Sequence, residues 1–329
     1  MDAAGRGGHG IRPGDCVVVS SKVVSKALGL RWTGTKADAV AAATVRVVAE
    51  RRSEVGTTQV VEALAGPVMA AAGVDASNTG PTGAVLVLPS EPDAEAARLR
   101  GDLLAVLGLP ASTALAVVLS DSVGRPWRQG LVDLALGAAG LHVVEDLRGH
   151  LDHDGRALAV TTRALADEVA AAADLVKGKA DGIPAAVVRG LPARWFAADA
   201  PGARSLVRTG AGDWFALGHV EAVRAALGVP PGTAPATEVG LPPASADEPF
   251  AARVGRVVAL ALHAAPEGSA DVGVDERAGS AEVTLSAPDG FELGRLVTRC
   301  EVAAHSEDLR GDVLRRSPGA VVVRLRPAG

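Results

Sequence analysis

Short apolar runs bounded by turn residues recur along the chain and predict its strands. A continuous run of four to six apolar residues between turns is typical of a buried strand. Runs of this kind predict strands at residues 16–19, 84–88, 114–119 and 185–188, with further strand-like residues in 60–71.

Longer segments predict helices between these strands. Thr35 and Asp38 have the spacing of a capping box, which predicts a helix over residues 35–52. Further helices are predicted at residues 90–107 and 163–176, and residues 131–141 predict either a helix or another buried segment.

The last third of the chain has a different pattern. Residues 228–249 are rich in Pro, Gly, Ala and Thr, which is typical of a linker. Helices are predicted beyond it at 254–263 and 292–305, and strands at 281–286 and 321–325. We therefore expect a main domain over 1–227, a linker over 228–249 and a small α+β domain over 250–329.

Composition narrows the class of protein. The chain has 329 residues, 48% of them hydrophobic, which is enough for a normal core. The formal charge of -5 argues against nucleic-acid or anionic-membrane partners. No apolar run approaches the ~18 residues of a membrane span, the first ten residues lack the apolar core of a signal peptide, and two cysteines make no disulfide framework. We expect a cytoplasmic protein.

Residues 120–130 carry the densest set of reactive groups, directly after the predicted strand 114–119. Asp121 and Ser122 offer hard oxygen ligands suited to Mg²⁺ or Mn²⁺. Arg125 and Arg128 offer planar forks that match phosphate or carboxylate. The alternative for this stretch alone is a solvated turn.

Three other segments have polar groups in similar positions. Hydroxyls and lysines follow the first strand in 20–26, an acid and an amide end the small-residue run 70–78, and a glycine-punctuated basic turn fills 177–184. Such groups can hold phosphate or a cation, although each segment alone is also consistent with an exposed turn. His150 and His153 suggest zinc only weakly, because two histidines on a polar loop are a poor indicator.

Taken together, these four segments resemble the coenzyme F420-0:L-glutamate ligase family, whose members add γ-linked glutamate to a deazaflavin coenzyme. The resemblance covers roughly residues 14–218. It implies a two-lobed α+β core with a mixed sheet, a homodimer, and GTP, L-glutamate and the F420-0 precursor as substrates. It also implies two divalent cations, Mg²⁺ or Mn²⁺, with K⁺ as a further candidate ion.

The resemblance assigns roles to individual residues. Nucleotide-binding positions match Ser21, Lys22, Lys26, Asn78, Lys177, Gly178, Lys179, Asp181 and Gly182. Metal ligands match Asp75, Asp121 and Ser122, and catalytic positions match Asp121, Arg125 and Arg128.

The chain departs from the family pattern in several places. Lys179 stands where archaeal members supply a further metal ligand, and an ammonium group cannot ligate a cation. The family's first strand and nucleotide-binding turn have only residues 1–13 to occupy, and residues 63–66 replace the usual Arg/His-Gly. The last ~80 residues are too few for the flavin-binding nitroreductase domain of some bacterial relatives. The matching loop of the family does not require either histidine, which removes the zinc interpretation.

The expected activity is therefore a GTP-dependent amide ligation through an acyl phosphate. The alternative is a catalytically weakened nucleotide- and metal-binding scaffold subunit of the same pathway. A flavin oxidoreductase fusion is the third interpretation and predicts a yellow protein, whereas we expect a colourless one.

Overall fold

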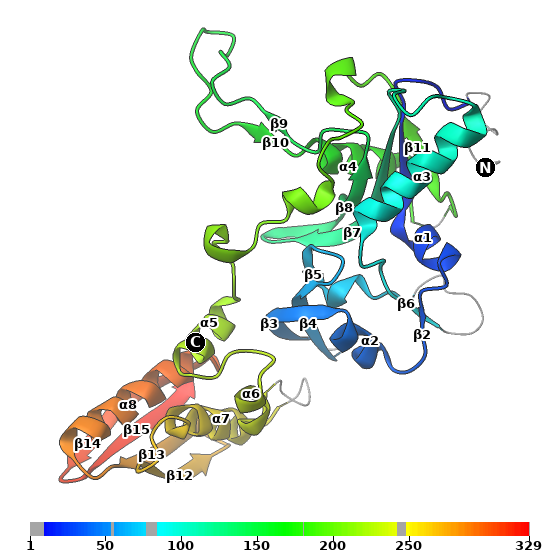
Figure 1. Ribbon diagram of the computed structural model, residues 1–329. Coiled ribbons are helices and arrows are strands. Elements are labelled where there is room, and N and C mark those ends of the chain that lie inside the picture. The colour runs from blue at the N-terminus through cyan, green and yellow to red at the C-terminus, as the bar shows by residue number, and fades with distance from the viewer. Residues whose placement is uncertain (1–9, 54–55, 77–83, 180, 242–247, 329) are drawn as a thin grey trace. The chain divides into compact units, whose positions relative to one another are not determined.

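The computed structural model describes residues 10–53, 56–76, 84–179, 181–241 and 248–328 (Figure 1). The chain divides into two compact units, and each is formed by two separate stretches of sequence. The first unit contains residues 1–45 and 61–213, and the second contains 46–60 and 214–329. Both units combine helices with sheets, so the predicted α+β class is confirmed.

A four-stranded mixed sheet in the order β11-β1-β7-β8 forms the centre of the first unit. Strand β1 (Cys16–Ser20) runs parallel to β7 (Ala116–Arg125) and antiparallel to β11 (Ala185–Val188), while β8 (Arg128–Ala139) is antiparallel to β7. Helices α3 (Pro92–Leu107) and α4 (Leu165–Lys177) pack against it.

Both faces of this sheet are covered, which explains why its central strands are apolar throughout. Val17 and Val19 of β1 lie in one buried cluster with residues of α3, which Figure 1 shows crossing the sheet. Cys16 and Val18 lie in a second cluster with residues of α4. Successive residues of a strand point to opposite faces, and a strand that is buried on both faces needs apolar residues at every position.

Shorter elements complete the first unit. They are α1 (Ser21–Ala27), β2 (Arg31–Trp32), α2 (Lys36–Ala42), β5 (Val68–Ala70), a 3₁₀ turn (Ala71–Gly73), β6 (Val85–Leu86), β9 (Glu145–Asp146), β10 (Thr162–Arg163) and further 3₁₀ turns at Ala193–Trp195, Ala203–Leu206 and Gly210–Gly212. Strands β3 (Thr44–Ser53) and β4 (Gly56–Ala63) lead from the first unit into the second and back, and form a sheet in the order β3-β4-β5.

The second unit is built on an antiparallel sheet in the order β12-β13-β15-β14. Its strands are β12 (Ser269–Asp275), β13 (Ser280–Ser286), β14 (Leu309–Ser317) and β15 (Ala320–Pro327). Its helices are α5 (His219–Ala226), α6 (Ala234–Glu238), α7 (Phe250–Leu262) and α8 (Gly290–His305). Alternate residues of β13 are buried in one core with α7 and α8, as expected for a sheet covered on one face.

A buried ionic network lies beside this core. The carboxylate of Glu307 accepts hydrogen bonds from Arg224 at 2.6 Å and from Arg256 at 2.7 Å, and Arg256 also pairs with Glu248. The main-chain oxygen of Glu307 accepts a further bond from Arg253 at 2.8 Å. All of these groups line a pocket of about 640 Å³ within the second unit.

Two predicted helices are corrected. The capping box of Thr35 and Asp38 is present, but α2 ends at Ala42 and is followed by β3. Thr44 and the valines after it are β-branched and favour extended backbone. Residues 131–141, for which a helix was one interpretation, lie mainly in β8, where small side chains let α3 approach closely. A Cβ atom at Gly137 would collide with the main chain of Pro92.

The reactive stretch 120–130 is a hairpin rather than a turn that follows a strand. Strand β7 continues through it to Arg125, and only Pro126 and Trp127 separate β7 from β8. Trp127 adopts a φ of 58°, in the left-handed region that tight turns use. The polar residues of this hairpin are therefore held in place by the pairing of β7 with β8.

The domain boundaries differ from those expected. Val229, Ala236, Val239 and Leu241 are buried in the core of the second unit, although they lie in the predicted linker. The composition rich in Pro and Gly correctly indicated frequent turns, but these turns alternate with apolar side chains that are buried in the core. Strands β12 and β14 were not predicted, because charged residues interrupt their apolar pattern.

No helix in the described part of the chain has the length and hydropathy required to cross a membrane.

Candidate functional site

A pocket of about 740 Å³ lies in the first unit, with wall residues at the end of β1 and in β7. The two strands run parallel and Ser20 is in register with Ser120. The pocket walls include described residues from all four segments singled out in the sequence, within 20–26, 70–75, 120–124 and 177–184. Folding therefore gathers groups from distant parts of the chain around one pocket.

Asp121 projects from β7 into the pocket wall, and the pKa of its carboxyl group is strongly raised. Burial raises the pKa of Asp121 to about 6, a hydrogen bond from the Ser122 main chain opposes this rise, and the nearby Asp133 charge adds to it. Lys179 and Lys22 lower the pKa, although not enough to cancel the effect of burial. Among the described residues, no side chain donates a hydrogen bond to this carboxylate.

Asp133 forms the buried floor of the pocket with Lys177. Its side chain is 4% exposed and accepts hydrogen bonds from Lys177 at 2.7 Å, Ser120 at 2.8 Å and Ser122 at 2.5 Å. Burial alone would raise the pKa of Asp133, but these hydrogen bonds, led by that from Lys177, hold the pKa below its usual value. Asp133 is therefore a fixed negative charge that is already neutralised within the protein.

The third acidic group, Asp75, is paired with Lys22. The two side chains meet at 2.5 Å and both line the pocket. The pair is partly exposed to solvent, so water and ions reach it. One of the predicted metal ligands is therefore bound to one of the predicted phosphate-binding lysines.

The remaining predicted nucleotide-binding residues are distributed unevenly. Lys26, Gly178, Lys179 and Gly182 line the pocket. Ser21 is 1% exposed at the start of α1 and is not among the residues that line this pocket, whereas the preceding residue, Ser20, is. Lys177 lines the pocket but directs its ammonium group to Asp133 and Ser120. Asp181 is exposed outside the pocket wall, and Asn78 lies outside the described residues.

The two predicted catalytic arginines lie at the exposed end of the β7–β8 hairpin. Neither Arg125 nor Arg128 is among the described residues that line the pocket. Arg125 donates to the main-chain oxygen of Gln129 at 3.4 Å. Their guanidinium groups are available to ligands that extend beyond the pocket.

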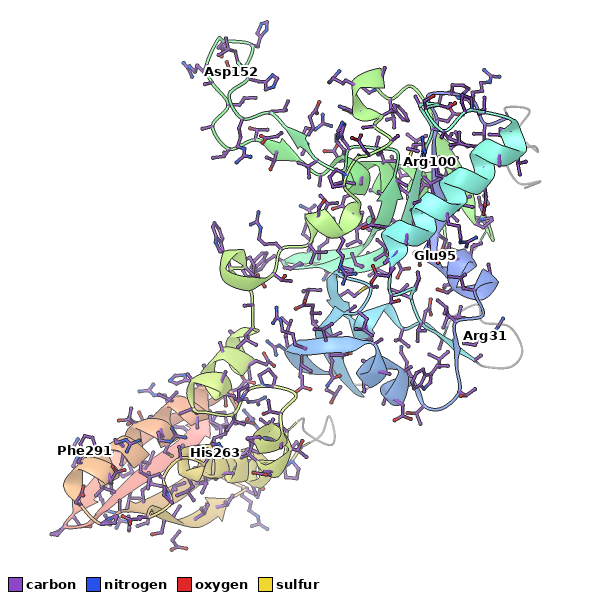
Figure 2. All side chains as sticks on the ribbon, viewed as in Figure 1. Arg31, Glu95, Arg100, Asp152, His263 and Phe291 are labelled. Atoms are coloured by element: carbon purple, nitrogen blue, oxygen red, sulfur yellow. The ribbon has the colours of Figure 1, made fainter. Side chains whose placement is uncertain are left out.

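The histidines singled out in the sequence lie elsewhere in the first unit. His150 and His153 belong to the loop between β9 and β10, which extends outward with Asp152 near its end (Figure 2). Asp152 shapes this loop by accepting hydrogen bonds from the main chain of Asp154 at 3.0 Å and Arg156 at 2.8 Å.

Four polar residues of the pocket wall were not among the predicted site residues: Ser20, Ser120, Asp133 and Asp174. The sequence did single out Asp133 in one respect. It is an acid within a run of small and apolar residues, and a buried acid needs a partner. The partner itself could not be read from the sequence, because Lys177 is 44 residues further along the chain.

The donor groups of the pocket fit a single hard cation better than a cluster. Carboxylate and hydroxyl oxygens are the ligands that Mg²⁺ and Mn²⁺ prefer, and Asp121 offers a carboxylate without a side-chain donor. The hydroxyl of Ser122 donates its hydrogen to Asp133, and its oxygen keeps lone pairs that can ligate a cation. No group of three or more His, Cys, Asp or Glu side chains in the described residues is arranged to hold a metal ion.

The sequence is similar to one protein family and to several of its named members. A family model described as F420-0:Gamma-glutamyl ligase matches residues 1–190. A coenzyme F420:L-glutamate ligase of Methanopyrus kandleri is 42% identical over 158 residues, which are 47% of this chain and 61% of that protein. Proteins of the same name from Halobacterium salinarum and Methanothermobacter thermautotrophicus are 40% and 38% identical, over 75% and 81% of their own lengths and 54% and 58% of this chain.

Proposed function

The chain belongs to the F420-0:gamma-glutamyl ligase family, and we propose that it is a GTP-dependent ligase that joins L-glutamate to the coenzyme F420-0 precursor. The observation that carries the proposal is the convergence of Asp121, Lys22, Lys26 and Lys179 on one pocket at the ends of two parallel strands. Ligands of α/β sheets commonly bind outside the carboxyl ends of such strands.

The proposed reaction has two steps. A carboxylate of the precursor attacks the γ-phosphorus of GTP, which forms an acyl phosphate and releases GDP. The amine of glutamate then attacks the acyl carbon, loses a proton, and displaces phosphate as the amide bond forms. Both steps bring several anions together, so positioning and positive charge are the main requirements.

Residues of this chain meet these requirements in different ways. Lys26 is exposed at the pocket and makes no ion pair with the described residues, so it is available to a phosphate. The buried contacts of Asp133 with Lys177 and Ser120 hold the floor of the pocket rigid. Arg125 and Arg128 would receive carboxylates of the substrates at the hairpin end. A divalent cation at Asp121 would neutralise phosphate charge and orient the phosphate oxygens.

We propose that the protein also shares the two-lobed fold and the homodimeric state that the family resemblance implies. Light scattering of the purified protein tests the second point, because a dimer has twice the mass of the 33.0 kDa chain. A mass that stays at that of one chain across the concentration range would exclude the homodimer.

Release of GDP tests the activity. The purified protein is incubated with GTP, Mg²⁺, the precursor and L-glutamate, and each component is omitted in turn. We expect GDP release that requires both the precursor and glutamate, together with a glutamylated product detected by mass spectrometry. Binding of GTP without acceptor-dependent GDP release would instead support the scaffold alternative.

The variant Lys26→Met is expected to weaken GTP binding by about one to two orders of magnitude. Methionine keeps most of the aliphatic stem but removes the charge, and a charge-assisted hydrogen bond contributes about 1.5–3 kcal/mol. Isothermal titration calorimetry measures the dissociation constant. The control is Arg31→Met, which removes an exposed positive charge on β2 that is not part of the pocket wall (Figure 2). Equal losses of GTP affinity in the two variants would show that only a diffuse electrostatic field, and no direct contact with Lys26, acts on the nucleotide.

A further inference from the structure

Some carboxylates of the ligand pocket form ion pairs with lysine side chains, and others do not. Asp75 is paired with Lys22 at 2.5 Å, and Asp133 is paired with Lys177 at 2.7 Å. Asp133 also lies 3.7 Å from the ammonium of Lys179, which is 62% exposed. Asp174 is a fourth carboxylate in the pocket wall, on the last turn of α4. Asp121 differs from Asp75 and Asp133 because no ammonium group forms an ion pair with it among the described residues.

These ion pairs limit how many cations the pocket can hold. A cation that binds Asp133 must approach a carboxylate already contacted by Lys177 and two hydroxyls, with a second ammonium close by. The ammonium of Lys177 occupies a lone-pair direction of the carboxylate, and both ammonium groups repel the incoming charge. Four carboxylates line the pocket, yet no three acidic groups in the described part of the chain are arranged to hold a metal.

We propose that this pocket takes one divalent cation, at Asp121, and that the ammonium groups of Lys177 and Lys179 supply the positive charge where a second cation would lie. Lys177 neutralises Asp133 permanently, because it is buried with it. Lys179 is exposed to the pocket and is the ammonium that a bound phosphate or carboxylate would reach. The inference rests on the proposed function for the identity of the anionic ligand, but not for the count of cations.

A lysine ammonium and a divalent cation hold an anion in different ways. A lysine is a flexible point charge with three donors, so Lys179 can follow an oxygen anion as it moves during group transfer. A divalent cation instead fixes its ligands in a set geometry. A cation at Asp121 would therefore fix the phosphate oxygens that it ligates, whereas the ammonium of Lys179 could follow other oxygens of the same phosphate as they move.

Counting bound Mn²⁺ tests the proposal without any dependence on ligase activity. Mn²⁺ is titrated into the protein, first nucleotide-free and then dialysed against a non-hydrolysable GTP analogue, and free Mn²⁺ is measured by electron paramagnetic resonance. We expect one tightly bound Mn²⁺ per chain in the wild type and none in Asp121→Asn. Lys179→Glu replaces the ammonium by a carboxylate beside Asp133, and we expect it to bind two.

A matched control separates this local effect from net charge. Lys36→Glu makes the same change of charge on the exposed face of α2, outside the pocket wall, and is expected to bind one Mn²⁺ like the wild type. Two Mn²⁺ per wild-type chain would overturn the proposal, as would none. A count of one in Lys179→Glu would overturn the role of Lys179. If GDP release fails while the wild type binds one Mn²⁺, the proposed function fails and the cation count stands.

Discussion

Replacing Asp121 with asparagine is expected to lower kcat for GDP release by about two to three orders of magnitude. Asparagine has nearly the same shape and keeps an oxygen for the main-chain hydrogen bond from Ser122. It removes the negative charge that we assign to cation binding, and charge stabilisation by a metal centre contributes several kcal/mol to a transition state, with each ~1.4 kcal/mol equal to a factor of ten. Steady-state assays at saturating Mg²⁺ measure the effect.

The same variant has an opposite expected effect on stability. Burial raises the pKa of Asp121 from 3.8 to about 6, so the folded protein holds this proton more tightly than the unfolded chain. Ionisation therefore disfavours the folded state, and stability is lost as pH rises through the interval from about 4 to 6. Asp121→Asn removes this loss and should unfold at the same temperature as the wild type, or a higher one, at pH 7. Turnover like that of the wild type would contradict the assignment of Asp121.

The second large effect is expected for Glu307→Gln in the second unit. Glutamine fits the same space but leaves the guanidinium groups of Arg224 and Arg256 without the carboxylate they share. Arg256 keeps its ion pair with Glu248, so the uncompensated charge is that of Arg224. Removing one partner of a buried ion pair costs about 3–5 kcal/mol, because the remaining charge is buried without compensation. Urea denaturation measures the change in the free energy of unfolding.

Glu292→Gln is the control for this variant. Glu292 pairs with Arg295 at 2.8 Å on α8, where Arg295 is exposed and Glu292 partly exposed to solvent. Exposed pairs of this kind contribute about 0–1 kcal/mol. If the two glutamine variants lose similar amounts of stability, the network around Glu307 does not hold the second unit together.

Where the sequence predicted the fold well, a local pattern and the tertiary environment agreed. The apolar run at 16–19 became β1, and helices α3, α4, α7 and α8 were predicted to within a few residues. The capping box at Thr35 marked the start of α2 correctly. The end of α2 was missed, because no local stop signal precedes the β-branched residues of β3.

The domain boundary was harder to predict, since it depends on contacts between residues far apart in the sequence. Val229 and Leu241 anchor the turn-rich segment 228–249 in the same core as α7 and α8. A protein cut at Pro249 would therefore expose these side chains, and we expect such a truncation to disturb the remaining part of the second unit. Turn residues alone do not distinguish a linker from a well-packed irregular segment.

The site was predictable as a set of residue types, but its internal pairing was not. Hydroxyl, acidic and basic residues after strand-like runs indicated an anion- and cation-binding pocket, and the structure brings the described members together. The pairing of Lys22 with Asp75 and of Lys177 with Asp133 depends on distances between separate segments. These pairs decide which carboxylate is open to a ligand.

The split origin of the second unit has a consequence for how the protein is made. Its first stretch, residues 46–60, leaves the ribosome well before the second stretch begins at Trp214. At typical synthesis rates of about 5–20 residues per second, that interval is roughly 8–30 s. During this time the main-chain oxygen of Val48 lacks the hydrogen bond from Gly218, and the main-chain N–H of Glu50 lacks its acceptor, the carboxylate of Glu221. Newly made chains should therefore depend on chaperones that shield the β3–β4 hairpin until translation ends.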